Sequence, residues 1–204
     1  MDTDFKAKFI DISRMIQTEF DRNISKYGEK IKCSRGCSEC CSQVFRITAI
    51  DTFMIKEHLK SLPAKRQDEL KSNARRYISK LERPATDNHE EDYNAQAEQL
   101  PLNSKGELRI PCPALGPEGE CTIYEARPIV CRRFGIPLYD YKNPGSIHAC
   151  HLNFDKGEEI IDIELIPNQT AIGMKWDDLK DEFLTATKTG EDNFTTIAHS
   201  ILSN

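Results

Sequence analysis

The stretch CSRGCSECC at residues 33–41 decides the fold, because it places four cysteines within nine residues. A second group of four is spread over a later segment, so the full set is Cys33, Cys37, Cys40, Cys41, Cys112, Cys121, Cys131 and Cys150. A structural zinc ion requires four soft ligands at tetrahedral corners. Cysteines grouped in this way in a reducing compartment usually hold a metal. We therefore predict that all eight are metal ligands, enough for two four-thiolate sites.

Two of these cysteines, Cys40 and Cys41, are adjacent in the sequence. Successive side chains of an extended segment point to opposite sides, so both thiolates can hardly bind one ion without strain. One of the pair should therefore reach toward ligands of the second group. This predicts that the two groups lie close in space, as one compact centre or two neighbouring ones, although about 70 residues separate Cys41 from Cys112.

The segment before this loop has a helical pattern. Its apolar residues recur at steps of three and four, which places on one stripe of a helix over residues 2–27 the side chains of Phe5, Phe9, Ile12, Ile16, Phe20, Ile24 and Tyr27. Gly28 can end this helix. The helix therefore leads the chain directly into the first cysteine group.

The segment after the loop predicts a short strand at Val44–Ile47. Thr48 and Asp51 then have the spacing of a capping box, which opens a helix to about Ser61.

A further helix is expected between Pro63 and Pro84. Beyond it, Leu108–Ile110 and Cys121–Tyr124 resemble the arms of a loose hairpin around a Gly-Pro-Glu-Gly turn at 116–119.

The last part of the chain predicts a short helix, a strand and two more helices. Arg127 and Pro128 open the short helix, which carries Cys131. Apolar and acidic residues alternate over Ile161–Leu165, which is typical of a half-buried strand. The two final helices have apolar faces made by Trp176, Leu179, Phe183 and Ala186 and by Phe194, Ile197 and Ile201.

These elements predict a mainly α fold with a small β hairpin or strand component and an irregular, cysteine-rich, metal-stabilised core. At 204 residues the chain suits a single domain over 1–204. Its parts would be an N-terminal amphipathic helix over 2–27, a cysteine-cluster metal-binding region over 33–151, and a C-terminal strand and helices over 158–204.

The composition argues against several partners. The formal net charge is −5, so the chain has no overall positive potential that would attract nucleic acid or an anionic membrane. No apolar stretch approaches the roughly 18 residues of a membrane helix. The N-terminus lacks the basic and apolar regions of a secretion signal. We therefore expect a cytoplasmic protein with reduced cysteines, no nucleic-acid or membrane partner, and a surface for a protein partner.

Basic residues flank the cysteines in a chain that is acidic elsewhere, namely Lys30, Lys32, Arg35, Arg127, Arg132 and Arg133. Four thiolates on a divalent cation leave a formal charge of about −2, which these residues can offset while they donate hydrogen bonds to sulfur. His151 is a reserve ligand for a site of three cysteines and one histidine. No nucleophile motif is present, so no catalytic residue is assigned.

The order of the cysteines resembles that of a known family. The residues that carry the resemblance are Cys33-x3-Cys37-x2-Cys40-Cys41, Cys112-Pro-x-Leu and Cys121-x-Ile-Tyr-Glu-x-Arg-Pro-x-x-Cys131-Arg. They are similar to the YkgJ-type cysteine-cluster family, a zinc- or iron-chelating domain, over residues 33–151. The resemblance implies metal binding by these cysteines. A related pattern in flagellin lysine methylases implies protein modification as an alternative activity.

Closed four-thiolate sites are structural, because no position remains for a substrate. The leading interpretation is therefore a zinc protein with a structural or regulatory role and no assigned reaction, holding about two ions. The main alternative is an iron–sulfur cluster protein, including an enzyme, because thiolates suit both zinc and iron–sulfur clusters. The spacing over residues 33–40 matches that of radical S-adenosylmethionine enzymes, but Glu39 stands where an aromatic residue is usual.

Two further alternatives remain open. Arg132 and Arg133 beside Cys131 would suit a nucleic-acid-binding zinc module, although the acidic net charge argues against extensive phosphate contact. A vicinal disulfide between Cys40 and Cys41 would suit a redox sensor, because cationic neighbours lower a thiol pKa and increase its reactivity.

Overall fold

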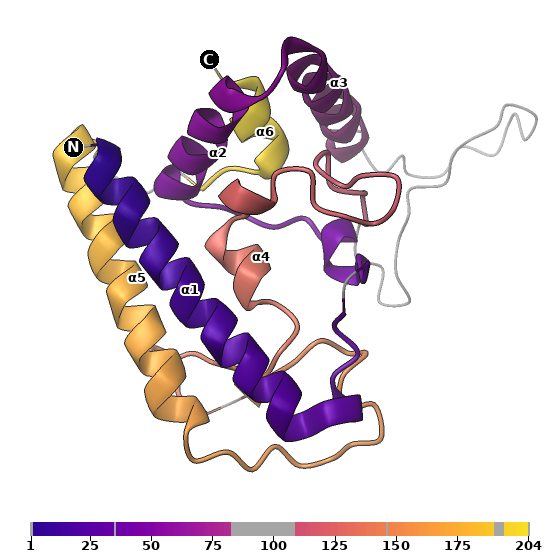
Figure 1. The fold of residues 1–204 in the computed structure, drawn as a ribbon, viewed down its shortest axis with the longest axis vertical. Coiled ribbons are helices and arrows are strands. Elements are labelled where there is room, and N and C mark those ends of the chain that lie inside the picture. The colour runs from indigo at the N-terminus through magenta and orange to yellow at the C-terminus, as the bar shows by residue number, and fades with distance from the viewer. Residues whose placement is uncertain (1, 35, 83–108, 146, 190–193, 204) are drawn as a thin grey trace, which may run out of the picture.

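The computed structural model describes residues 2–34, 36–82, 109–145, 147–189 and 194–203. Its largest feature is a pair of long antiparallel helices, α1 (Asp2–Tyr27) and α5 (Leu165–Thr187), which lie side by side (Figure 1). Among the helices of these described residues, none combines the length and apolar composition that a membrane crossing needs.

The helix predicted over residues 2–27 is confirmed as α1. Phe9 is fully buried and meets the ring of Trp176 on α5 edge-on, with 6.1 Å between ring centroids. Phe5 makes the same kind of contact with Phe183 at 5.1 Å. Such aromatic pairs contribute about 1 kcal/mol each beyond the area that they bury. Gly28 follows the helix with a φ of +53°, a conformation that favours glycine.

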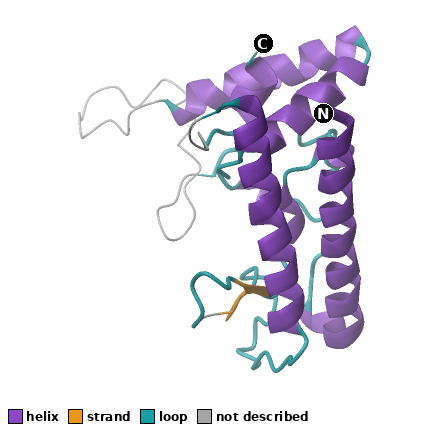
Figure 2. Ribbon diagram, turned by 90° about the vertical axis from the view of Figure 1, so that its left-hand side faces the viewer, coloured by secondary structure: helices purple, strands orange, loops and turns teal. Residues whose placement is uncertain are grey.

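Three more helices pack together at one end of this pair. They are α2 (Ala49–Ser61), α3 (Ala64–Leu81) and α6 (Ile197–Leu202), and α6 contacts both of the others. Figure 2 shows this group crossing the ends of α1 and α5. The fold is therefore mainly helical, as the sequence predicted, and the hydrophobic core runs from the α1–α5 pair into the second group.

The predicted capping box is confirmed at the start of α2. The hydroxyl of Thr48 accepts the N–H of Asp51 at 3.3 Å, and the carboxylate of Asp51 accepts the N–H of Thr48 at 3.1 Å. The second carboxylate oxygen of Asp51 accepts the N–H of Ile129 at 3.0 Å. Ile129 is the first residue of the predicted short helix, α4 (Ile129–Arg133), so one buried carboxylate fixes the start of two helices.

The regular β structure lies elsewhere than predicted. A two-stranded antiparallel sheet joins β1 (Leu138–Tyr139) to β2 (Ile147–His148). The strand predicted at Val44–Ile47 is wrong, because pairing there is limited to isolated bridges at Gln43 and Ile47.

The predicted hairpin is confirmed only near its turn. Leu115 forms an isolated bridge with Cys121 around residues 116–119, whereas Arg109 pairs with Gln43 instead. Leu108 lies outside the described residues.

The strand predicted at Ile161–Leu165 is also wrong. Ile161 and Ile163 are 69% and 88% exposed, whereas Asp162 between them is buried, and Leu165 is already the first residue of α5. The pattern of burial is inverted: the carboxylate of Asp162 faces cationic partners on α1, and the two isoleucines face solvent.

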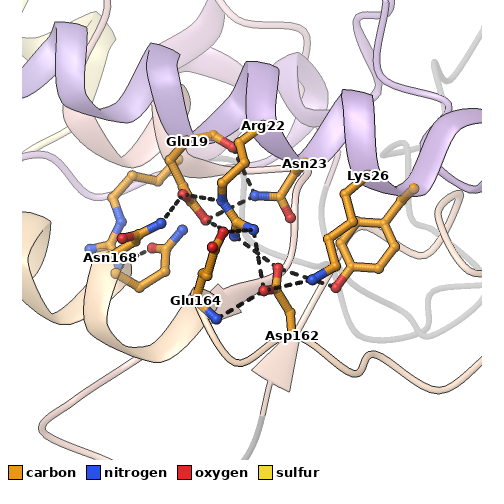
Figure 3. A network of polar contacts seen from close by, with 10 residues as sticks. Glu19, Arg22, Asn23, Lys26, Asp162, Glu164 and Asn168 are labelled. Carbon is orange, nitrogen blue, oxygen red and sulfur yellow. Dashed lines mark hydrogen bonds and ion pairs between the residues drawn. The ribbon is translucent and has the colours of Figure 1, made fainter.

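Asp162 lies at the centre of a polar network that joins the start of α5 to α1 (Figure 3). Its carboxylate pairs with Arg22 at 2.8 Å and with Lys26 at 2.9 Å. Arg22 also pairs with the buried Glu19 at 2.6 Å, and Asn168 of α5 donates to that same carboxylate at 2.9 Å. Burial opposes ionisation of Asp162, but the hydrogen bonds from Arg22 and Lys26 outweigh it and hold its pKa at about 2.

Replacing Asp162 with asparagine is expected to lower the free energy of unfolding by roughly 2 kcal/mol at pH 7. Because the pKa is lowered on folding, this contribution is present above the ordinary value of 3.8 and is lost as the pH falls toward about 2. Urea denaturation at pH 7 and pH 3 measures the difference between the two proteins, which should shrink at pH 3. The control is D11N, because Asp11 forms an exposed pair with Arg14. A D162N protein no less stable than D11N at pH 7 would contradict the assignment.

Candidate metal centre

The first four cysteines lie in the loop between α1 and α2. The loop begins with a 3-10 turn at Gly28–Lys30 and contains a second one at Glu39–Ser42, which holds Cys40 and Cys41. The adjacent pair therefore sits in a tight turn and not in the extended segment that the sequence argument assumed. The thiol of Cys41 donates a hydrogen bond to the sulfur of Cys40.

The second cysteine group reaches this loop through two backbone contacts. The N–H of Cys112 donates to the carbonyl of Cys41 at 2.7 Å. Gly119, with a φ of +80°, lies so close to the loop that a Cβ atom there would be 2.9 Å from the carbonyl oxygen of Gly36. The prediction that the two groups lie close in space is therefore confirmed.

Cys150 lies beside Cys33, the first cysteine of the chain. The N–H of Cys150 donates to the carbonyl of Gly135 at 3.2 Å. The sulfur of Cys33 packs against the same glycine, where a Cβ atom would be 2.6 Å from it. Burial raises the pKa of Cys33, and the nearby thiolates of Cys150 and Cys37 raise it further. The structure therefore places Cys150 with the first group.

A second set of thiols gathers around Cys112. Burial raises the pKa of Cys112 to about 12, and the thiolate of Cys121 contributes to this shift. The pKa of Cys131 is raised by burial and then by Cys112, and that of Cys41 by its hydrogen bond to Cys40, by burial and by Cys112. Cys41, Cys121 and Cys131 therefore each lie near Cys112.

Cys40 lies between the two sets and beside a cation. The hydrogen bond from Cys41 and the charge of Arg127 lower the pKa of Cys40 to about 6, against the effect of burial. The guanidinium Nη2 of Arg127 is 4.0 Å from the sulfur of Cys40. Burial lowers the pKa of Arg127, but surrounding thiolates, led by Cys131 and Cys40, more than offset this. Arg127 is thus positioned to compensate negative charge on sulfur.

The other basic residues that flank the cysteines contact groups other than the thiols or are exposed. Arg132 donates to the carbonyls of Tyr124 and Glu125 and lies over the Tyr124 ring at 5.4 Å. Arg133 turns away toward α5, where it donates to Gln169 at 3.1 Å. Lys30 and Lys32 are exposed, and Arg35 lies outside the described residues.

His151, the reserve ligand, is 62% exposed at its side chain. Its Nε2 atom is 3.6 Å from the carboxylate of Glu39, which also pairs with Arg109. The structure therefore directs His151 toward a carboxylate in the same loop as Cys40.

Asn153 is a site residue that the sequence reasoning missed. Its buried side chain accepts the N–H of Lys32 at 2.7 Å and donates to the carbonyl of Gly135 at 2.5 Å and to the sulfur of Cys33 at 3.5 Å. Its own N–H donates to the carbonyl of Cys150 at 2.8 Å. The only signal in the sequence is its position three residues after Cys150, which is too common to single it out.

Replacing Asn153 with aspartate is expected to reduce metal affinity by about 10–100-fold, because hydrogen bonds that orient ligands have effects of that size. The aspartate keeps an oxygen for the Lys32 N–H but loses the donors to Cys33 and Gly135. Competition with a chromogenic chelator measures the affinity. The control is N143D, the same change at an exposed residue of the β1–β2 loop. Equal affinity of the two variants would show that Asn153 does not support the thiol.

A pocket of about 590 Å³ opens onto the thiols. Cysteine side chains line it together with Arg127, Arg132 and two residues of α1, Ile16 and Phe20. The cysteines that line it are Cys33, Cys37, Cys40, Cys41 and Cys121. Both sets of thiols are therefore reachable from one cavity.

The donor chemistry of the region fits a thiophilic metal, because all eight cysteines are free thiols and lie in adjoining segments. In the present side-chain positions, no three Cys, His, Asp or Glu side chains of the described residues are placed to hold one ion. Binding therefore requires thiols that are already neighbours to turn toward a common point.

A protein-family model described as "CxxCxxCC: Putative zinc- or iron-chelating domain" matches residues 32–149, more than half of the chain. The matched range contains seven of the eight cysteines and ends one residue before Cys150. No curated protein and no solved structure matches the chain.

Proposed function

Because this chain belongs to the CxxCxxCC family of putative zinc- or iron-chelating domains, we propose that its eight cysteines hold about two zinc ions. The observation that carries the proposal is the convergence of two cysteine segments about 70 residues apart, joined by the hydrogen bond from Cys112 to Cys41. Tetrahedral thiolate sites are the usual setting of structural zinc.

Metal binding would change the protonation of the buried thiols. Burial raises the pKa of Cys112 to about 12 and that of Cys131 well above its ordinary value, so these thiols stay protonated unless a cation stabilises the thiolate. A metal ion supplies that charge and releases the protons. Arg127 beside Cys40 then offsets part of the negative charge that remains on a four-thiolate site.

The role that this arrangement suits is structural or regulatory. Metal bound by both segments would clamp the loop at 33–41 to the segment at 112–150 and so fix the surface around the pocket. That surface would serve a protein partner in a reducing compartment such as the cytoplasm, and no reaction is assigned.

An iron–sulfur protein, including an enzyme related to flagellin lysine methylases, is the second candidate. The observation that favours it is the pocket of about 590 Å³ that Cys37 and other cysteines line, since a cluster enzyme needs space for a substrate beside its metal.

Elemental analysis with a visible spectrum, on full-length protein purified without oxygen, tests the proposal. We expect a colourless protein with about two zinc ions per chain. Absorbance near about 400 nm with bound iron and sulfide would establish the iron–sulfur alternative. A protein without either metal after reconstitution would contradict metal binding.

A further inference from the structure

Three exposed isoleucines lie close together where the chain enters α5. Ile161 and Ile163 are largely exposed, and Ile166 is 46% exposed. They are three of the eight large apolar residues that are exposed in the described part of the chain, and they fall within six residues. Single exposed apolar residues are ordinary, but a cluster marks an interaction surface. Figure 1 shows this segment as the orange loop at the end of the α1–α5 pair away from α2, α3 and α6.

An ion-pair network holds two of these isoleucines outward. Asp162 lies between them, and its buried carboxylate faces Arg22 and Lys26 of α1 (Figure 3). Successive side chains of an extended backbone point to opposite sides. With Asp162 turned toward α1, Ile161 and Ile163 are turned toward solvent. The contacts with α1 therefore fix the apolar side chains on the surface.

The main chain beside the isoleucines is also unpaired. Residues 157–162 form neither helix nor strand. No main-chain N–H or C=O group of residues 158–161 is hydrogen-bonded to another described residue. A row of unpaired main-chain groups in an extended segment is a template for a strand from another chain. A partner that lies along this segment can therefore pair with its main chain and cover its isoleucines.

The charges around the isoleucines define the kind of partner. Residues 157–166 include four acidic residues and no basic one. Glu159 precedes the isoleucines, Glu164 lies among them, and both glutamates are exposed. The neighbouring cations, Arg22 and Lys26, are already paired with Asp162. A second copy of this segment would bring like charges together, which is unfavourable, whereas a basic partner complements them.

We propose that residues 158–166 bind an extended segment of another protein that adds to this chain as a strand. Every second side chain of that segment faces the surface. Two branched apolar residues lie opposite Ile161 and Ile163, with a lysine or arginine at each end, opposite Glu159 and Glu164. The surface lies outside residues 32–149, which the family model matches, so this inference goes beyond the proposed function and does not rest on the metal.

Fluorescence anisotropy of a labelled peptide, acetylated and amidated KTVTITK, tests the proposal on the full chain. Its lysines, valine and isoleucine share one face of a strand. We expect saturable binding below about 1 mM. Binding to I161S/I163S should be at least about 10-fold weaker, because two apolar contacts are lost. The control is I10S/M174S, which changes exposed apolar residues of α1 and α5 and should bind as the unchanged chain does.

Variants of the peptide separate the contributions to binding. Replacing both lysines with glutamate, or the valine and isoleucine with serine, should weaken binding strongly. The N–H groups of alternate residues point to opposite edges of a strand. Methylating the N–H groups of one edge should therefore abolish binding, and methylating those of the other should leave it unchanged. Equal binding of both methylated peptides would overturn pairing with the main chain.

Two outcomes would overturn the proposal as a whole. One is the absence of saturable binding, or equal binding to I161S/I163S and I10S/M174S. The other is a dimer of the chain, seen by sedimentation, that I161S/I163S dissociates, because the occupant would then be a second copy. Zinc content and the urea midpoint of I161S/I163S should be unchanged. A chain that binds zinc but not the peptide would contradict this inference alone, and a chain that binds no zinc would contradict the proposed function.

Discussion

Replacing Cys131 with serine is expected to remove about one zinc ion per chain and to lower the free energy of unfolding of the metal-bound protein by about 5 kcal/mol. Cys131 is buried on α4 near Cys112, so in the proposed site the loss of its thiolate would leave three sulfur ligands and a poorly bound ion. Urea denaturation with zinc analysis of the same samples measures both effects.

The matched control is the same pair of proteins stripped of metal. There the substitution only places a hydroxyl in an apolar site, which should cost about 1–2 kcal/mol. If the full loss persisted in the stripped proteins, Cys131 would be a packing residue and not a ligand.

Replacing Asp51 with alanine is expected to lower the free energy of unfolding by about 3–4 kcal/mol, because hydrogen bonds to a charged group contribute about 1.5–3 kcal/mol each and do not add fully. Its carboxylate is buried and accepts the N–H of Thr48 and that of Ile129. The change removes the cap of α2 and the support for the start of α4. Urea denaturation measures the stability. The rate of zinc release to a chelator measures whether the metal near Cys131 is held less tightly.

T48A separates the two roles of this carboxylate. It removes the hydroxyl of the capping box but leaves the contact from Asp51 to Ile129, so a loss of only about 1 kcal/mol is expected. A D51A protein as stable as T48A would show that the contact with α4 contributes nothing.

The parts of the fold that the sequence predicted are those set by local rules. The apolar stripe over residues 2–27 predicted α1, because an apolar helix face is buried whichever element covers it. Thr48 and Asp51 predicted the start of α2, because a capping box is satisfied within four residues. The adjacency of Cys40 and Cys41 also led to the expectation that distant cysteines meet, but its premise was wrong, because the pair lies in a 3-10 turn and not in an extended segment.

The parts that it missed depend on partners far along the chain. Alternation over Ile161–Leu165 indicated a strand with buried isoleucines, but Arg22 and Lys26 draw Asp162 inward instead. The position of Cys150 beside Cys33, and the bridging role of Asn153, arise from the path of the chain around Gly135. No local pattern encodes such contacts, so the membership of each thiol group could not be read from spacing.

X-ray absorption at the zinc edge of the protein identifies the atoms bonded to the metal. Zinc held by the eight cysteines should show a first shell of about four sulfur atoms at about 2.3 Å around each ion. A shell made mainly of nitrogen or oxygen at about 2.0–2.1 Å would contradict ligation by the eight cysteines.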